Sequence, residues 1–205
     1  YSLSPDTFRN NIEQLQKNGF KFVTFNDVKT GNIKGNRNVL VTIDDGNESV
    51  WDAYYTIMKP AGIKPLLGIY PAVIGKMKYA MTWEQLAKLR DEGCSFAAHG
   101  YNHMYLSSRY YKEDIVQFKK EIYLSKKVLE QKLGIGIDTM IYPFGVHSNE
   151  SLAMLKDAGY IYGFTLDQKR AGVPVEDGFH IPRYMMTKPS NKGIVALLIR
   201  HGNKD

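Results

Sequence analysis

The sequence predicts an α/β fold built on a parallel β-sheet. Short apolar segments with the length of strands alternate with longer segments of helical spacing, and no internal sequence repeat accompanies the alternation. Candidate site segments follow directly after three of the apolar segments, which is where parallel sheets gather ligands. The pattern fits an open sheet or a closed barrel equally well. Strands are expected at residues 19–25, 37–43, 65–70, 94–98, 137–142 and 160–166.

The amino-terminal part of the chain is expected to begin with a helix. Residues 4–6, Ser-Pro-Asp, supply a capping serine and a proline suited to the first turn, and Gly19 ends the helix. Two of the expected strands follow. A helix-like stretch at 48–59 then leads into the apolar segment 65–70, which is typical of a strand buried on both faces.

The middle of the chain contains the clearest helix signals. Thr82 begins the sequence Thr-Trp-Glu-Gln, a capping box that opens a helix, and Gly93 closes it. The longest helix is expected at 111–133, with apolar residues along one side. Its charged residues, among them Glu121 and Glu130, are expected on a solvated face. Two further helices are expected, at 148–158 and after Ser190.

Composition is that of one ordinary globular domain spanning residues 1–205. The chain is 43% hydrophobic and 23% charged, with a formal charge of +6, but no basic run exceeds a pair, so nucleic-acid binding is not expected. No apolar run approaches the roughly 18 residues of a membrane span, and the single Cys94 excludes an internal disulfide. Because the chain begins at Tyr1 rather than methionine, we expect an upstream segment. We expect the protein to be a monomer.

Three candidate site segments fall at the ends of expected strands. Asp44 and Asp45 follow the segment 37–43, His99 follows a strand, and Pro-Phe-Gly at 143–145 follows another. Because the carboxyl ends of parallel strands meet at one edge of the sheet, the three segments are expected on a single rim.

The two acids and two histidines predict a metal-dependent hydrolase. His99 and His103 are four residues apart, so a helical turn would let both reach one metal ion. Two histidines and one carboxylate leave a coordination position open, as in catalytic zinc sites. Asp45 is the preferred ligand and Asp44 the preferred general base, although strand periodicity alone leaves that assignment open. An Asp-Asp-Gly turn could instead cap the next helix, but the histidine pair favours a metal site.

These motifs resemble the polysaccharide deacetylase family, also called the NodB homology domain or carbohydrate esterase family 4. The resemblance is carried by Thr-Ile-Asp-Asp-Gly at 42–46 and His-Gly-Tyr-Asn-His at 99–103, in the family's order, and Tyr-Pro-Phe-Gly at 142–145 is similar to its third motif. The resemblance implies a distorted (β/α) barrel of about seven parallel strands with outer helices. It also implies metal-dependent removal of N-acetyl, sometimes O-acetyl, groups from polysaccharides.

The resemblance further implies a role for each matched residue. Asp45, His99 and His103 would hold Zn2+ or another divalent metal such as Co2+ or Ni2+. Asp44 would deprotonate the attacking water, and the backbone N–H of Phe144 would help bind the oxyanion. The amine leaving group also needs a proton, and no matched residue supplies it.

The sequence departs from the family pattern in its third motif. The family usually begins that motif with an arginine that holds the catalytic aspartate, but Ile141 or Tyr142 stands there. Arg183, in Ile-Pro-Arg-Tyr, is the candidate replacement, and a surface salt bridge is its alternative role. Asp167 is either the acid of the family's fourth motif or a turn residue. His201 stands in a superficial Leu-x-His motif near a helix end, where a capping or exposed role is preferred.

The first eight residues, Tyr-Ser-Leu-Ser-Pro-Asp-Thr-Phe, resemble the start of the subgroup that acts on poly-β-1,6-N-acetylglucosamine. In that subgroup the general-acid motif lies on the amino-terminal side. The resemblance implies a biofilm-type N-acetylglucosamine polysaccharide as substrate and an extracellular, cell-surface or periplasmic location. Deacetylation of peptidoglycan or chitin oligosaccharides is an alternative, as is a carbohydrate-binding pseudoenzyme that retains the metal site.

Overall fold

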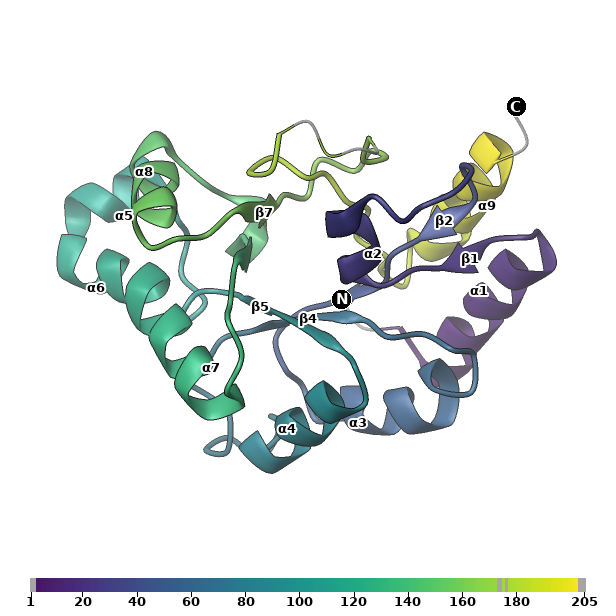
Figure 1. Cartoon of the computed structure of the whole chain (residues 1–205), viewed down its shortest axis with the longest axis horizontal. Coiled ribbons are helices and arrows are strands. Elements are labelled where there is room, and N and C mark those ends of the chain that lie inside the picture. The colour runs from purple at the N-terminus through teal and green to yellow at the C-terminus, as the bar shows by residue number, and fades with distance from the viewer. Residues whose placement is uncertain (1–2, 173–174, 176, 203–205) are drawn as a thin grey trace.

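The computed structural model describes residues 3–172, 175 and 177–202. Five parallel strands form the main sheet in the order of the chain: β3 (Thr42–Ile43), β4 (Leu66–Ile69), β5 (Ser95–Ala98), β6 (Thr139–Ile141) and β7 (Tyr162–Phe164). The sheet curls into a half-barrel whose outer side is followed by helices (Figure 1). The predicted α/β class with a parallel sheet and outer helices is therefore confirmed.

The segment expected as one strand at 37–43 serves two sheets. Its first part, β2 (Asn38–Val39), pairs with β1 (Lys21–Phe22), and its second part, β3, pairs with β4. Within the described chain, five strands belong to the main sheet and two form a separate small sheet. The expected barrel of about seven strands is thus slightly too large, because the chain turns between Val39 and Thr42 and changes partner.

The helices mostly begin and end where capping signals stand. Ser4 Oγ accepts a hydrogen bond from Thr7 N–H at 3.2 Å, and Thr82 forms the expected capping box with Gln85. No helix in the described ranges has the length and apolar character to cross a bilayer. The helices are α1 (Pro5–Lys17), α2 (Phe25–Thr30), α3 (Ser49–Ala53), α4 (Trp83–Asp91), α5 (Ser108–Glu113), α6 (Ile115–Lys119), α7 (Ser125–Leu133), α8 (Asn149–Asp157) and α9 (Asn191–Gly202), with π-helical turns η1 (Tyr54–Met58) and η2 (Lys120–Leu124) and the 3₁₀ turn η3 (Pro143–Gly145).

Two elements differ from the expectation because polar side chains bond to the backbone. The strand expected at 19–25 is short, since Thr24 and Asp27 form a capping box that starts α2. The helix expected at 111–133 is interrupted at Asp114, which leaves the helical conformation with φ −151° and caps α6 by accepting from Gln117 N–H at 3.0 Å.

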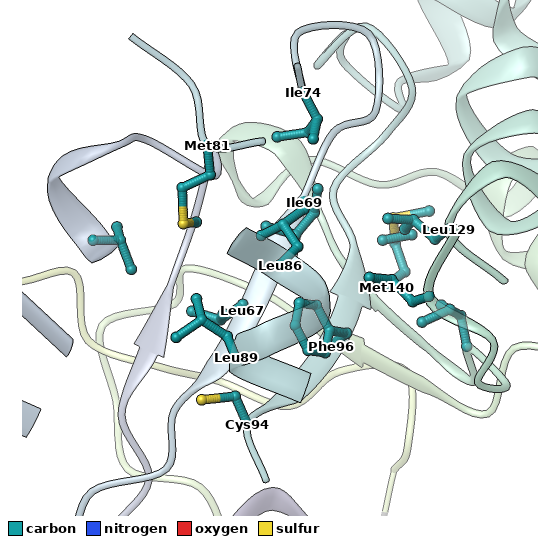
Figure 2. Close-up of a cluster of buried hydrophobic side chains, with 14 of the residues drawn as sticks. Leu67, Ile69, Ile74, Met81, Leu86, Leu89, Cys94, Phe96, Leu129 and Met140 are labelled. Atoms are coloured by element: carbon teal, nitrogen blue, oxygen red, sulfur yellow. The ribbon is translucent and has the colours of Figure 1, made fainter. Parts of the chain in front are cut away.

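The hydrophobic core lies between the sheet and the helices α4 and α7. Leu67 of β4 and Phe96 of β5 face Leu86 of α4, and Leu129 of α7 closes the cluster at the β6 side (Figure 2). Cys94 is buried at the edge of this cluster, where burial raises the pKa of its thiol to about 11. It behaves as a packed small hydrophobic residue, and the core gives the strand ends a rigid base.

Candidate active site

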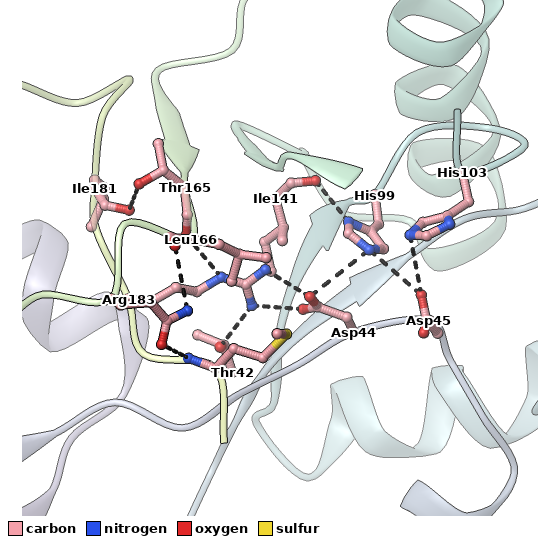
Figure 3. Close-up of polar contacts among 12 residues, drawn as sticks. Thr42, Asp44, Asp45, His99, His103, Ile141, Thr165, Leu166, Ile181 and Arg183 are labelled. Carbon is pink, nitrogen blue, oxygen red and sulfur yellow. Dashed lines mark hydrogen bonds and ion pairs between the residues drawn. The ribbon is translucent and has the colours of Figure 1, made fainter. Parts of the chain in front are cut away.

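The expected rim is present at the carboxyl ends of the strands. Ile69, the last residue of β4, pairs with Ala98, the last residue of β5, and Ala98 pairs in turn with Met140 of β6. Residues that follow these strands therefore project from the same edge of the sheet. Asp44 and His99 both lie there (Figure 3).

Asp44 and Asp45 leave the end of β3 in different directions. Asp45 has φ +76°, a left-handed conformation that few side chains adopt. Its carboxylate lies toward His103, whereas that of Asp44 lies toward Arg183 (Figure 3). The structure thus separates the two neighbouring acids into different environments, which strand periodicity left open.

Three side chains form a cluster whose geometry suits a divalent metal. Asp45 Oδ1 lies 3.5 Å from His99 Nε2 and 3.6 Å from His103 Nε2, and the three ligand atoms lie within 4.8 Å of one another. Two ligands of a tetrahedral zinc ion, each about 2.1 Å from it, are about 3.4 Å apart. The donor set of two imidazoles and one carboxylate fits zinc and leaves a fourth position for water or substrate.

The first histidine is oriented by the neighbouring strand. His99 is 2% exposed, and its Nδ1 lies 2.8 Å from the carbonyl oxygen of Ile141. A carbonyl only accepts, so Nδ1 carries the proton and donates it, which leaves the lone pair of Nε2 for a metal. The ring is therefore fixed in the tautomer that a metal site requires.

The second histidine is held by neighbouring rings and by an unusual backbone. His103 has φ +63°, and its ring lies 4.6 Å from that of His99 and 4.5 Å from that of Phe144. Burial lowers the pKa of His103, and the neighbouring imidazole of His99 lowers it further. A lowered pKa favours the neutral imidazole that metal ligation requires.

Asp44 forms a bidentate ion pair with Arg183, which is 139 residues away in the sequence. Arg183 Nη1 and Nη2 donate to the two carboxylate oxygens at 2.8 and 2.6 Å, and the guanidinium also bonds to Thr42 Oγ1 at 3.0 Å and the Thr165 carbonyl at 3.3 Å. Burial by itself would raise the pKa of Asp44, but the electrostatic effects of the neighbouring His99 and of the Arg183 guanidinium outweigh it and hold the pKa below its usual value. The structure brings together the pair that the sequence proposed.

Phe144 occupies the turn after β6 in a strained conformation. Its φ is +58°, the residue is 47% exposed, and its ring stacks on Tyr105 with a centroid distance of 4.1 Å. Among the described residues, Asp45, His103 and Phe144 are three of the four non-glycine residues with positive φ. Such strain concentrates at functional sites, where the surrounding structure must over-determine it.

The other histidines take part in separate contacts. His147 packs on Tyr142 at 4.8 Å and on His180 at 4.7 Å, and His180 Nδ1 lies 2.6 Å from an oxygen of Asp177. Asp167 accepts a hydrogen bond from Thr165 Oγ1 at 2.9 Å, an arrangement that suits a turn residue.

The last histidine of the sequence lies on a different element. His201 is in the final turn of α9, which packs on α1 beside the small β1–β2 sheet (Figure 1). A cation in that turn is favoured by the helix dipole.

The sequence interpretation was wrong for Glu121. The residue was expected on a solvated face, but its side chain is fully buried and bonded to the loop that carries His103. The helical spacing could have predicted this burial. Glu121 is three residues after the buried Phe118 and four before the buried Ser125, so it lies on the same face of the helix as these residues.

Together these contacts define a class of protein. A carboxylate held by arginine beside three side chains that could bind a metal ion, at the carboxyl edge of a parallel sheet, is the arrangement expected of a metal-dependent hydrolase. The chain belongs to the polysaccharide deacetylase family, since residues 31–163 match that family's sequence profile. The family resemblance drawn from the motifs is confirmed.

Two relatives sharpen the comparison. The poly-beta-1,6-N-acetyl-D-glucosamine N-deacetylase of Staphylococcus aureus (strain MRSA252) is 26% identical over 199 residues, covering 91% of this chain and 68% of the relative. The enzyme of the same name from Staphylococcus epidermidis is 23% identical over 207 residues, covering 95% of this chain and 71% of the relative.

Two solved structures are similar over nearly the whole chain. The structure of IcaB from Ammonifex degensii superposes with a TM-score of 0.82 at 25% identity, covering 97% of this chain and 91% of that one. The deacetylase PplD of Streptococcus pyogenes has a TM-score of 0.78 at 19% identity, covering 95% and 86% of the two chains, and shows the shared fold.

Proposed function

We propose that this protein removes N-acetyl groups from poly-β-1,6-N-acetylglucosamine with the help of a bound zinc ion. The observation that carries the proposal is the cluster of Asp45, His99 and His103 beside an aspartate clamped by Arg183. The proposed substrate is the one for which the staphylococcal relatives are named.

Each site residue has a distinct part in the proposed reaction. A zinc ion held by Asp45, His99 and His103 would supply Lewis-acid polarisation of the acetamide carbonyl and acidify the attacking water. Asp44 accepts the proton of that water at a carboxylate oxygen. When the C–N bond breaks, the amine nitrogen takes up a proton from a solvent water molecule.

The neighbouring groups position the base and the substrate. Arg183 holds both oxygens of Asp44, so the base cannot rotate away from the water. The backbone N–H of Phe144 donates to the carbonyl oxygen as negative charge develops there. The exposed rings of Phe144 and Tyr105 offer a flat apolar surface at the mouth of the site, suited to the face of a sugar ring.

We further propose that the protein acts outside the cell membrane, at the cell surface or in the periplasm, as a monomer. A poly-N-acetylglucosamine of the biofilm type is an extracellular polymer, so its deacetylase must meet it there. Secretion and a role at the cell wall belong to this proposal.

Acetate release from N-acetylglucosamine oligomers tests the proposed function. We expect release from β-1,6-linked oligomers that depends on added zinc and is lost in Asp44→Asn and His103→Ala. His201→Ala is the matched control, because His201 lies on α9, and we expect this variant to retain full activity. Unchanged release in both site variants contradicts the mechanism.

The choice of oligomer tests the substrate. Faster release from β-1,4-linked chitin oligomers or from peptidoglycan contradicts the assignment of the polymer. Oligomer binding by the full-length protein without any acetate release contradicts the assignment as an enzyme.

A further inference from the structure

A buried carboxylate lies behind the loop that joins the two histidines. Glu121 is 0% exposed. Its Oε2 accepts from Tyr101 N–H at 2.9 Å and from Met104 N–H at 3.3 Å, and its Oε1 accepts from Asn102 N–H at 3.1 Å and from Asn102 Nδ2 at 3.0 Å. Both oxygens therefore act as acceptors, and the loop closes around the carboxylate group.

The loop needs such a partner because its backbone is strained. Gly100 has φ +72° and His103 has φ +63°, and a histidine in this left-handed region costs conformational energy that other contacts must offset. These two turns direct successive backbone N–H groups to one point, as in an anion-binding nest. Glu121 occupies that point from within the protein.

The surrounding structure is built to place the carboxylate there. Glu121 lies in the π-helical turn η2, and the buried Tyr160 hydroxyl donates to the carbonyl of Ile122 in that turn at 3.0 Å. Ser125 Oγ donates to the carbonyl of Gly100 at 2.7 Å, which holds the other side of the loop. A Cβ on Gly100 would lie 2.6 Å from Glu121 Oε2, so only glycine leaves room for the carboxylate.

We infer that Glu121 is a positioning residue of the metal site. Its hydrogen bonds hold the loop in the conformation that brings His103 Nε2 to within 3.6 Å of Asp45 Oδ1. Glu121 does not itself touch the metal or the substrate; it acts through His103. The inference rests on the proposed metal site, and it adds that the affinity of that site depends on a carboxylate from the helix behind it.

The test compares two carboxylates of the same helical segment. Glu121→Gln places an NH2 group against N–H donors whichever way the amide is turned. Glu130→Gln is the matched control: Glu130 also accepts from a backbone N–H, that of Ile137 at 3.0 Å, but Ile137 precedes β6 at the opposite end from the site. The dissociation constant of Zn2+ is measured on the whole chain by competition with a chromophoric chelator, and far-UV circular dichroism in EDTA checks the fold.

We expect Glu121→Gln to raise the zinc dissociation constant about 10- to 100-fold, the usual effect of losing a group that orients a metal ligand. Glu130→Gln should remain within about twofold of the unaltered chain. Substitution with Co2+ gives a second readout, since its absorption spectrum reports ligand number and geometry and should change only in the Glu121 variant.

Each outcome separates this inference from the proposed function. If the unaltered chain fails to bind zinc, the proposed metal site is overturned and this inference with it. If it binds zinc and a folded Glu121→Gln binds equally tightly, Glu121 has no positioning role although the metal site stands. If Glu121→Gln does not fold, Asn102→Ala decides, because Asn102 is exposed and loses only its side-chain bond to Glu121: a weaker zinc affinity supports the inference, and an unchanged one overturns it.

Discussion

Replacing Arg183 by methionine tests how strongly the clamp on Asp44 matters. The substitution removes two charge-assisted hydrogen bonds to the carboxylate, at 2.6 and 2.8 Å, together with bonds to Thr42 and Thr165. Removing one partner of a buried ion pair costs about 3–5 kcal/mol. The Asp44 side chain is 27% exposed, so water relieves part of this cost, and we expect about 2–3 kcal/mol lost from the free energy of unfolding.

The same substitution should impair the reaction. Without the two-point clamp the carboxylate of Asp44 rotates freely, and misplacing a catalytic group by about 1 Å costs about 100-fold in rate. We expect kcat/KM for acetate release to fall about 100-fold in Arg183→Met. Arg183→Lys keeps the charge but not the planar two-point contact, so an intermediate loss of about tenfold is expected.

Urea denaturation in EDTA gives the stability, and acetate release with saturating zinc gives the activity. Arg109→Met is the matched control, because Arg109 also pairs with a carboxylate, Glu113, at 2.7 Å but has a side chain 86% exposed. It should change the free energy of unfolding by no more than about 0.5 kcal/mol and leave kcat/KM unchanged. An Arg183→Met protein with kcat/KM within threefold of the unaltered enzyme refutes the view that Arg183 positions the base.

Three other predictions concern the metal, the strained turn and the acid stability. Zinc at about 1,000 times its dissociation constant should stabilise the chain by about 4 kcal/mol in calorimetry, and Asp45→Asn should abolish most of that gain; an equal gain in the variant contradicts the ligand assignment. Phe144→Gly removes the ring that stacks on Tyr105 but suits the φ of +58°, so unfolding should change by less than about 1 kcal/mol while KM rises several-fold; an unchanged KM shows that the ring does not contact substrate. Burial by itself raises the pKa of Glu130, but hydrogen bonds from Ile137 and Lys126 outweigh burial and lower this pKa in the folded state. The carboxylate therefore stabilises the fold above the ordinary glutamate pKa, and this stabilisation is lost as the pH falls through the lower pKa of the folded state. Glu130→Gln should reduce the dependence of the unfolding free energy on pH between about pH 5 and pH 3, and an unchanged dependence contradicts this.

Much of the fold could be predicted from interactions between residues that are close together in the sequence. The capping box at Thr82 and the apolar segments that became β4 and β5 depend on neighbouring residues, and they appear where the sequence predicted them. The predictions failed where a side chain competed with regular structure. Thr24 capped a helix instead of extending a strand, and Asp114 broke a helix that periodicity read as continuous.

The candidate site divides in the same way. The motifs alone named Asp44, Asp45, His99 and His103, because strand ends and a four-residue spacing are local properties of the sequence. Arg183 and Asp44 are 139 residues apart in the sequence, so only the tertiary structure could show that they are in contact.

The sequence by itself determined the α/β class, the rim and the residue types that carry the chemistry, since these follow from periodicity and from order along the chain. The tertiary structure decided which aspartate contacts both histidines, how far the sheet closes and which charged side chains are buried. Glu121 shows the reason: the same carboxylate would be solvated on an isolated helix, and it is buried here because a distant loop with strained backbone supplies the N–H groups that replace water.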